Sequence, residues 1–254
     1  MTQKIFDSHA HYDDEAFDND REDVLGGLLS DKVCGIINCG VDIKTSVFSL
    51  KLAKKYDKIY CACGFHPHEA TNADDNAIKE LKELLKEPKA IAVGEIGLDY
   101  HYDFSPREVQ IKVFEQQLQV ANKLDLPVIV HDRESHEDVL RLLKQYKPKG
   151  VVHCFSGSVE MAKEVVKLGM YIGIGGAVTF KNAKKPVQVA QAVPIDRLLL
   201  ETDAPYMSPV PLRGKRCTSD YIYYTAEKIA ALREIAVDDL LSQNIKNIKT
   251  LFNI

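Results

Sequence analysis

The chain has 254 residues, a formal net charge of −4 and six cysteines. This length can bury a large core and suits either two ordinary domains or one α/β barrel. The acidic balance argues against architectural nucleic-acid binding, although it leaves room for a local basic patch inside a cleft.

The beginning of the chain and its cysteines indicate a compartment. Met1–Lys4 lead directly into an apolar segment, which leaves no room for a signal peptide. No apolar run approaches the roughly 20 residues that span a bilayer. The cysteines form no C-x-x-C pair, which favours reduced, buried thiols over a zinc knuckle or a thioredoxin motif. We therefore expect a cytoplasmic protein without membrane contact, and no obligate protein partner is evident.

Short apolar runs recur along the chain, each followed by a segment with helical spacing. Some are apolar at consecutive positions, as in Leu198–Leu200, which is typical of parallel strands covered on both faces. The predicted strands are Ile5–His9, Val33–Cys39, Ile59–Phe65, Ala90–Ile96, Pro127–His131, Gly150–Cys154, Met170–Gly175 and Arg197–Glu201.

Helix signals lie between these strands. Ser105–Glu108 predicts an N-cap serine, a proline at N1 and a capping-box glutamate. Ser135 and Ser158 are candidate N-caps of two further helices, the second of which ends with Gly169 in the C′ position. Two more helices are expected after the last strand.

Strict alternation of strand and helix favours a single-domain (β/α)₈ TIM barrel of the α/β class over residues 1–254. An open doubly wound sheet stays compatible with the pattern, because alternation alone does not show closure. No G-x-G-x-x-G motif follows the first strand, which removes the usual dinucleotide-binding interpretation.

Histidines mark the end of the first predicted strand. His9 and His11 stand two residues apart, and residues i and i+2 of a strand project from the same face. The spacing suits two ligands of one metal ion. Alone it is weak evidence, because imidazoles bind metals only with further ligands around them.

The other strand ends supply those ligands. Seven of the eight histidines lie at or just past a predicted strand end, and His136 is the exception. Taken singly, Glu95 could pair with a surface lysine and Asp203 could cap a turn. Structural histidines have no reason to gather at one end of successive strands, whereas a metal site at the barrel's active face requires it. The candidate metal ligands are His9, His11, Glu95, His131, His153 and Asp203.

Four imidazoles and two carboxylates are too many for one four- or five-coordinate ion. They suit two ions about 3.5–4 Å apart that share a bridging carboxylate. Such a pair activates a bound water and polarises a phosphoryl or carbonyl oxygen. Because the sequence holds no nucleophilic serine elbow and no cofactor motif, it predicts metal-assisted hydrolysis.

In combination, these motifs resemble the signatures of the TatD family of metal-dependent deoxyribonucleases, which are amidohydrolase-like barrels. The resemblance runs from about residue 4 to the C-terminus. The segments that carry it are Asp7–His11, Gly64–His68, Gly94–Tyr100, His131–Glu134, His153–Gly157 and Glu201–Tyr206.

The resemblance implies a role for each candidate. Asp203 becomes the proton acceptor for the attacking water, Glu95 bridges the metal ions, and His66 lies beside the site in contact with the substrate phosphate or its water. The implied ligands are His9, His11 and Asp203 for one metal, and His131 and His153 for the second, with Glu95 between them.

The resemblance also implies hydrolysis of DNA phosphodiester bonds, often by 3′→5′ exonuclease action, with magnesium commonly named as the cofactor. Four imidazole ligands suit zinc or manganese better than magnesium, which prefers oxygen and water. We therefore expect two divalent ions per chain and leave Mg, Mn and Zn open. The expected substrate is DNA, single-stranded or at its ends.

After the last strand the chain departs from the family pattern. Leu212, Cys217 and Ser219 stand where the family carries histidine, asparagine and proline. A basic cluster survives there and could clamp phosphates, while a solvated charged loop is the equally ordinary alternative. The candidate substrate-contacting residues are His66, Arg133, Arg213, Lys215 and Arg216.

Two other functions stay open. The same site could hydrolyse another ester or amide bond, such as that of a D-aminoacyl-tRNA or a lactone. Because Glu95 stands where the carbamylated-lysine amidases carry lysine, those enzymes are a poorer match. A non-catalytic barrel that binds a metal or a partner is the third hypothesis.

Overall fold

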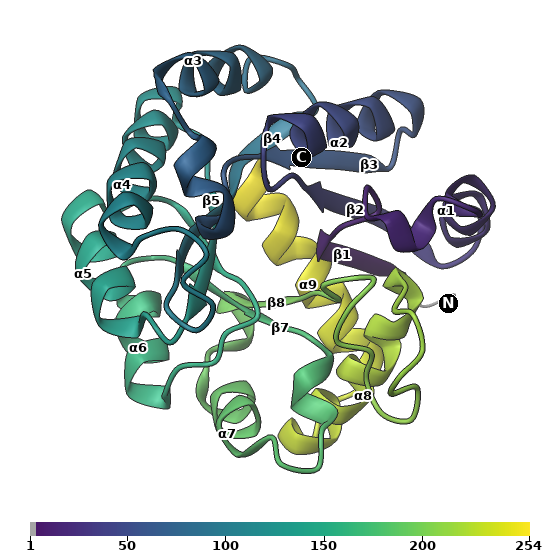
Figure 1. Ribbon diagram of the computed structural model, residues 1–254. Helices are drawn as coiled ribbons and strands as arrows, with labels where there is room; N and C mark the ends of the chain where they lie inside the picture. Colours follow the sequence, from purple (N-terminus) through teal and green to yellow (C-terminus); the bar gives the residue numbers. More distant parts are fainter. Residues whose placement is uncertain (1–3) are drawn as a thin grey trace.

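The computed structural model describes residues 4–254. Parallel strands form one eight-stranded sheet in chain order, surrounded by helices (Figure 1). All the predicted strands are present, with ends that differ by at most three residues. The strands are β1 (Ile5–Ala10), β2 (Val33–Cys39), β3 (Ile59–Cys63), β4 (Ala90–Asp99), β5 (Val128–Arg133), β6 (Gly150–Val152), β7 (Tyr171–Ile174) and β8 (Leu198–Leu200).

Each strand is followed by helical structure that covers the outside of the sheet. The α-helices are α1 (Arg21–Ser30), α2 (Ile43–Lys55), α3 (Asp75–Leu84), α4 (Arg107–Leu124), α5 (His136–Tyr146), α6 (Val159–Lys167), α7 (Lys184–Ala192), α8 (Ile222–Arg233) and α9 (Val237–Phe252). The 3₁₀ helices are η1 (Glu15–Phe17), η2 (Pro67–Asn72), η3 (Gly176–Thr179), η4 (Ile195–Arg197) and η5 (Ser219–Tyr221). Within residues 4–254, no helix has the length and apolar character needed to cross a membrane.

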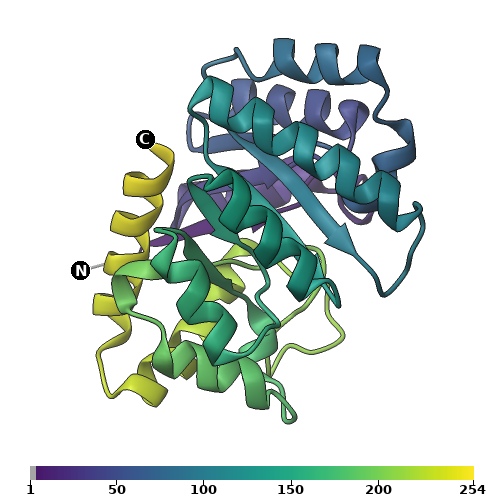
Figure 2. The same ribbon diagram turned by 90° about the vertical axis from the view of Figure 1, so that its left-hand side faces the viewer.

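Two apolar cores divide the interior. One lies between the sheet and its helices, and the other joins inward-facing strand residues such as Phe6 and Leu199 to Ile248 and Phe252 of α9. Figures 1 and 2 show α9 running behind the barrel, at the end away from the strand tips. Because α9 fills the N-terminal end, only the C-terminal face is left for a site.

The sheet is nearly closed, and its seam between β8 and β1 differs from the other junctions. The seven other neighbouring pairs form parallel ladders. At the seam, a single bridge joins Ala10 to Ala204, beyond the end of β8. Below it, the side chain of Asn244 accepts from the Leu200 N–H at 2.8 Å and donates to the Phe6 carbonyl at 2.9 Å. The predicted barrel is confirmed, but side chains complete it.

Asp7 ties the same seam from inside the protein. Its carboxylate accepts from the Thr202 hydroxyl at 2.6 Å and from the Ser219 hydroxyl at 2.7 Å. Burial raises the pKa of Asp7 to about 6. Ser219, one of the departures from the family pattern, thus has a structural use. The Asp203 N–H donates to the His9 carbonyl at 3.0 Å, so the network holds the first strand to the segment that follows the last one.

One predicted helix cap is wrong and another is confirmed. Pro106, rather than Ser105, occupies the N-cap of α4. The Ser105 hydroxyl instead donates to the carbonyl of His68 at 2.9 Å, which ties together two loops at the C-terminal face. Ser158 caps α6 through its side chain as predicted, whereas Ser135 takes the N-cap position of α5 without such a bond.

Candidate metal centre

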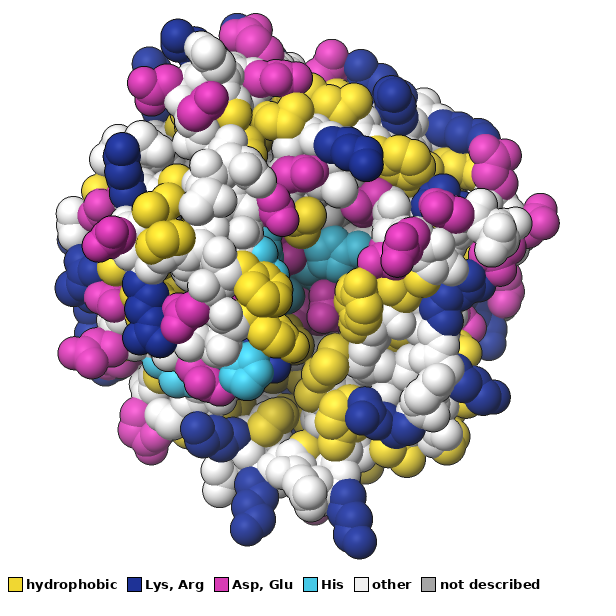
Figure 3. Space-filling model, viewed as in Figure 1, with side chains coloured by type: hydrophobic (Ala, Val, Ile, Leu, Met, Phe, Trp, Pro, Cys, Tyr) yellow, Lys and Arg dark blue, Asp and Glu magenta, His cyan; other side chains and the backbone are white. Residues whose placement is uncertain are grey.

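The predicted ligands converge at the C-terminal ends of the strands. His9 lies on β1, Glu95 on β4 and His131 on β5, while His153 and Asp203 follow β6 and β8. Figure 3 looks onto this face and shows histidine and acidic side chains inside a hollow. The chain therefore gathers groups from five strand ends at one place, as the barrel prediction requires.

Glu95 stands at the middle of the cluster. Its Oε2 lies 3.4 Å from His9 Nε2 and 3.5 Å from His11 Nε2. Its Oε1 lies 2.8 Å from His131 Nδ1 and 2.7 Å from His153 Nε2. Burial disfavours the charged carboxylate, but the surrounding imidazoles hold the pKa of Glu95 well below its usual value. Each oxygen faces a different pair of imidazoles, which is the arrangement of a bridging carboxylate.

Asp203 completes the group on the Oε2 side of Glu95. Its Oδ1 lies 3.6 Å from His9 Nε2 and 3.5 Å from His11 Nε2. The residue has φ +66, in the left-handed region that side chains seldom adopt outside functional or strained positions. The pKa of Asp203 is lowered overall. Burial raises it, but the hydrogen bond from His11 and the neighbouring imidazoles outweigh that effect. The carboxylate is thus ionised and available as a ligand.

Outer partners orient the imidazoles. His11 Nδ1 lies 2.8 Å from the carbonyl of Cys39, which makes Nδ1 a donor and turns Nε2 toward the cluster. His131 Nε2 lies 3.2 Å from Asp99 Oδ2. Metal-binding histidines commonly have such partners on the second ring nitrogen. Sequence reasoning missed both partners, although Asp99 lies within the Gly94–Tyr100 motif.

Two histidines of the cluster differ strongly in pKa. Burial lowers the pKa of His9 to about 4. For His131, burial also disfavours the charge, but hydrogen bonds to Asp99 and Glu95 outweigh it and raise the pKa to about 9. At neutral pH the protein alone therefore holds one imidazole neutral and another protonated. Such divergent pKa values are typical of functional sites.

The residues fit divalent metal ions. The Nε2 atoms of His9 and His11 face one another at 3.0 Å, where at most one hydrogen can lie between them. His153 Nε2 and His131 Nδ1 face one another in the same way, at 3.4 Å. Converging nitrogen lone pairs and carboxylate oxygens are a donor set suited to zinc, manganese and similar ions. We infer that the cluster is built to hold cations.

His66 lies beside this cluster, with Nε2 3.5 Å from Glu95 Oε1. Its Nδ1 accepts from the His68 N–H at 3.2 Å, and burial keeps the pKa of His66 well below its usual value. The neutral ring therefore carries its hydrogen on Nε2. An N–H cannot ligate a metal but can donate to an oxygen, so the geometry suits a contact to substrate.

The predicted basic residues lie further out. The Arg133 guanidinium stands over the Tyr102 ring, 4.7 Å from its centroid, and that of Arg213 stands 3.8 Å from the Phe180 centroid. Lys215 is exposed. Among the described residues, none of these side chains contacts the cluster through a hydrogen bond or an ion pair, so their contact with substrate stays a prediction.

Arg216 is engaged elsewhere. Its guanidinium donates to both carboxylate oxygens of Asp20, at 2.8 and 2.7 Å, and to the Ala16 carbonyl at 2.6 Å. These bonds tie the loop after β8 to the segment around η1. The substrate contact predicted for Arg216 stays a prediction, and it would require the guanidinium to give up these bonds.

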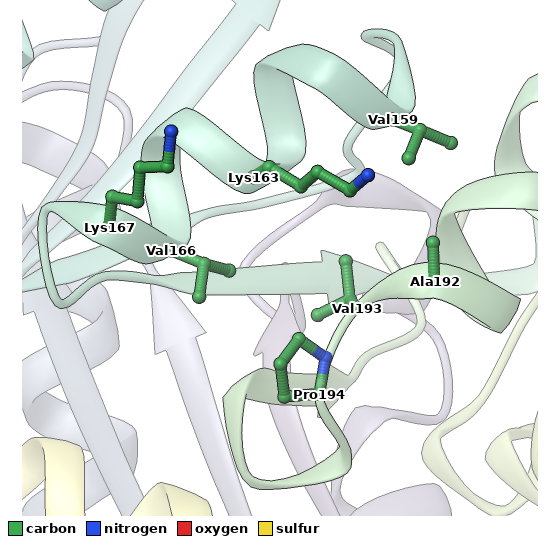
Figure 4. A pocket seen from close by; sticks show the side chains of 7 residues that line it. All are labelled: Val159, Lys163, Val166, Lys167, Ala192, Val193 and Pro194. Carbon is green, nitrogen blue, oxygen red and sulfur yellow. The ribbon is translucent and has the colours of Figure 1, made fainter.

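A second hollow lies on the outside of the barrel between α6 and α7 (Figure 4). Its lining offers only aliphatic groups and the stems of two lysines: Val159, Lys163, Val166, Lys167, Ala192, Val193 and Pro194. That lining contains no carboxylate or imidazole, so it offers no set of metal-ligating side chains.

A parallel barrel with an imidazole–carboxylate cluster at its C-terminal face is an arrangement suited to metal-dependent hydrolases. The family described as "TatD related DNase" matches residues 6–253. The chain belongs to this family, which confirms the resemblance read from its motifs.

Individual relatives agree with that membership. The "uncharacterized metal-dependent hydrolase YabD" of Bacillus subtilis is 42% identical, covering 98% of this chain and 99% of the relative. The "3'-5' ssDNA/RNA exonuclease TatD" of Salmonella typhimurium is 32% identical over 98% of this chain and 99% of its own. The crystal structure of YjjV, a TatD homologue from Escherichia coli, superposes with a TM-score of 0.93 at 34% identity and full coverage of both chains.

Proposed function

We propose that this protein hydrolyses phosphodiester bonds of single-stranded nucleic acid, DNA above all, from the 3′ end, and that it does so with two divalent metal ions. The observation that carries the proposal is the position of Glu95, whose two oxygens face separate pairs of imidazoles. The exonuclease name of the Salmonella typhimurium relative supports the choice of bond.

The ions would take the ligands that the geometry groups together. When bound, such a pair lowers the pKa of a water molecule and polarises a phosphoryl oxygen. The nitrogen-rich donor set favours zinc or manganese over magnesium. The proposed ligands are His9, His11 and Asp203 for one ion. His131 and His153, which both face Glu95 Oε1, are the proposed ligands of the other, with Glu95 between the two sets.

Asp203 is the proposed proton acceptor. Its side chain is 21% exposed, whereas that of Glu95 is 4% exposed, so a water entering the cleft reaches Asp203 more readily. The lowered pKa of Asp203 keeps it ionised at neutral pH. A positioned carboxylate of this kind contributes general-base catalysis.

His66 is the proposed donor to the phosphate. Its neutral ring presents the Nε2–H beside Glu95, and that hydrogen can turn to a phosphoryl oxygen that carries growing negative charge. Arg133, at the end of β5, supplies a positive charge further out in the cleft. Both contacts position the substrate without forming a covalent bond to it.

A nuclease assay tests the proposal. Protein stripped with EDTA is reloaded with Mg²⁺, Mn²⁺ or Zn²⁺ and given single-stranded DNA or RNA labelled at the 5′ end. Shortening from the 3′ end in single-nucleotide steps is expected. Asp203→Asn should lower kcat by about 100-fold or more. Asp196→Asn changes an exposed carboxylate in η4 and serves as the matched control.

Three results would each remove a part of the proposal. Absence of cleavage with all three metals contradicts the nuclease activity. Turnover of D-aminoacyl-tRNA or lactones in place of nucleic acid would move the reaction to another bond. Well under one metal ion per purified chain, with no uptake on reloading, would leave a non-catalytic barrel.

A further inference from the structure

The loop of residues 100–106, between β4 and α4, presents two aromatic rings to solvent at the face that holds the metal centre. Tyr102 is 47% exposed and Phe104 is 67% exposed. Their rings stack with centroids 5.2 Å apart and planes 21° from parallel. We call this pair the aromatic platform. Single exposed apolar residues are ordinary, but a stacked aromatic pair beside a cleft marks a binding surface.

The distribution of exposed apolar side chains supports this interpretation. Five large hydrophobic residues are exposed in residues 4–254. Four of them, Tyr102, Phe104, Tyr206 and Val210, belong to the loops after β4 and β8, and the fifth is Leu124 at the end of α4. In Figure 3, hydrophobic side chains border the hollow that contains the histidines. Apolar exposure is thus concentrated around the cleft.

The platform loop is held in place before any ligand arrives. Asp99 Oδ1 accepts from the Tyr102 N–H at 2.9 Å. Ser105 Oγ donates to the carbonyl of His68 at 2.9 Å, which fastens the loop to the segment carrying His66. A rigid aromatic surface loses little conformational entropy on binding, which favours affinity.

The platform also lies next to the metal centre. The His68 ring stands edge-on against both platform rings, with centroid distances of 4.8 Å to Phe104 and 5.5 Å to Tyr102. His68 Nε2 lies 2.9 Å from Asp99 Oδ2, and that same oxygen lies 3.2 Å from His131 Nε2. One imidazole and one carboxylate therefore separate the platform from a proposed metal ligand.

The chemistry of the platform fits a nucleobase. Its two stacked rings offer flat π faces, which match another flat ring system better than an aliphatic chain. The Arg133 guanidinium over Tyr102 adds a positive charge at the platform, where the phosphate attached to a stacked base would need one. Aromatic rings beside cationic side chains are the usual means of holding single strands without sequence preference.

We propose that the aromatic platform stacks on the nucleobase next to the scissile phosphate of a single-stranded nucleic acid. This inference rests on the proposed nuclease function and adds the part of the site that binds the base. Stacking accounts for sequence tolerance, because every base has a π face. It also predicts that a nucleotide without a base binds poorly.

Steady-state kinetics on paired substrates test the platform. One oligonucleotide is an ordinary single strand, and its partner carries a tetrahydrofuran residue without a base at the 3′-terminal nucleotide. The metal-loaded wild type should show a KM about 10-fold or more lower for the ordinary strand. The double variant Tyr102→Ala/Phe104→Ala should lose this preference by raising KM for the ordinary strand alone, with kcat little changed.

Two matched variants separate stacking from apolar contact and from folding. Phe104→Tyr keeps a ring and should retain the preference, whereas Phe104→Leu keeps apolar bulk without a π face and should weaken it. Leu124→Ala removes the exposed apolar side chain that lies away from the cleft loops and should change neither KM. If the double variant retains the wild-type preference, or if its KM rises equally for both strands, the platform is overturned.

A binding measurement distinguishes failure of the platform from failure of the nuclease function. A single strand with 2-aminopurine at the 3′ end is titrated with protein in EDTA, where quenching of its fluorescence reports stacking. Quenching by wild type, but not by the double variant, supports the platform even if no substrate is cleaved. Equal quenching by both proteins, or none by wild type, overturns the platform even if nuclease activity is found.

Discussion

The floor of the cleft and its rim are built by different means. On the floor, His9 and Glu95 are 0% and 3% exposed and come from strands joined by backbone ladders. On the rim, Tyr102 and Phe104 are 47% and 67% exposed and come from a loop held by side-chain hydrogen bonds. Strands hold buried ligands in the fixed positions that a metal site needs. Loops can vary in sequence and thereby determine which substrate binds.

The largest effect is expected on the floor, from Glu95→Gln. The amide keeps the size of the side chain but loses the charge that two pairs of imidazoles share, and its nitrogen cannot ligate a metal. We expect metal content to fall by at least one ion per chain and activity by about 1,000-fold or more. Metal analysis by mass spectrometry and the nuclease assay measure the two effects.

A matched substitution on the rim completes that test. Glu134 stands at the end of β5, and its exposed carboxylate pairs with His101 at 2.9 Å. Glu134→Gln should leave metal content unchanged and alter activity only a few-fold, because exposed pairs contribute little. Equal losses of metal content and activity in Glu95→Gln and Glu134→Gln would contradict this difference between floor and rim.

Next in size is the seam beneath the floor. Asn244→Leu leaves the Leu200 N–H and the Phe6 carbonyl buried without their side-chain partner. Each such loss costs about 1–3 kcal/mol, so urea denaturation should show the unfolding free energy lowered by about 2–6 kcal/mol. Ser242→Ala, at an exposed position of the same helix, should change it by less than about 0.5 kcal/mol. Similar stability of both variants would mean that Asn244 does not hold the barrel closed.

A smaller effect is expected from Asp99→Asn, at the boundary between floor and rim. Asp99 accepts from His131, His68 and the Tyr102 backbone, so the change disturbs a metal ligand and the platform loop together. Loss of an outer partner of this kind lowers metal affinity by about 10–100-fold. Metal titration followed by calorimetry measures it. An unchanged affinity would show that Asp99 serves the rim alone.

The floor could be predicted from the sequence because its pattern is local. The spacing of His9 and His11 indicates a pair of ligands, and Glu95 lies at the end of an apolar run that predicts a strand. Once the strand ends are known, a barrel brings them together without further information. Closure at β8 cannot be predicted in this way, since strand–helix alternation gives no account of Asn244, which reaches the seam from α9.

The rim could not be predicted in this way. Exposed aromatic residues such as Phe104 look ordinary in sequence, and their stacking depends on the path of a loop. Arg216 illustrates the same limit, since a basic residue in a basic cluster suggests a phosphate contact, and that contact stays a prediction. Its partner, Asp20, lies 196 residues away in the chain, so no local sequence pattern predicts that pairing. Side-chain partners of loops are set by tertiary structure, so sequence patterns rank them poorly.

The smallest effect separates two neighbouring arginines of the rim. Arg213→Ala removes an exposed cation that only stands over Phe180, so KM for DNA should rise about threefold at low salt and less at high salt. Arg216→Ala instead removes the paired bonds to Asp20 and should lower the unfolding free energy by about 1 kcal/mol without changing KM. Kinetics at two salt concentrations and urea denaturation distinguish them. If Arg216→Ala raises KM and leaves stability unchanged, the guanidinium exchanges Asp20 for phosphate, and the rim is more adaptable than its hydrogen bonds indicate.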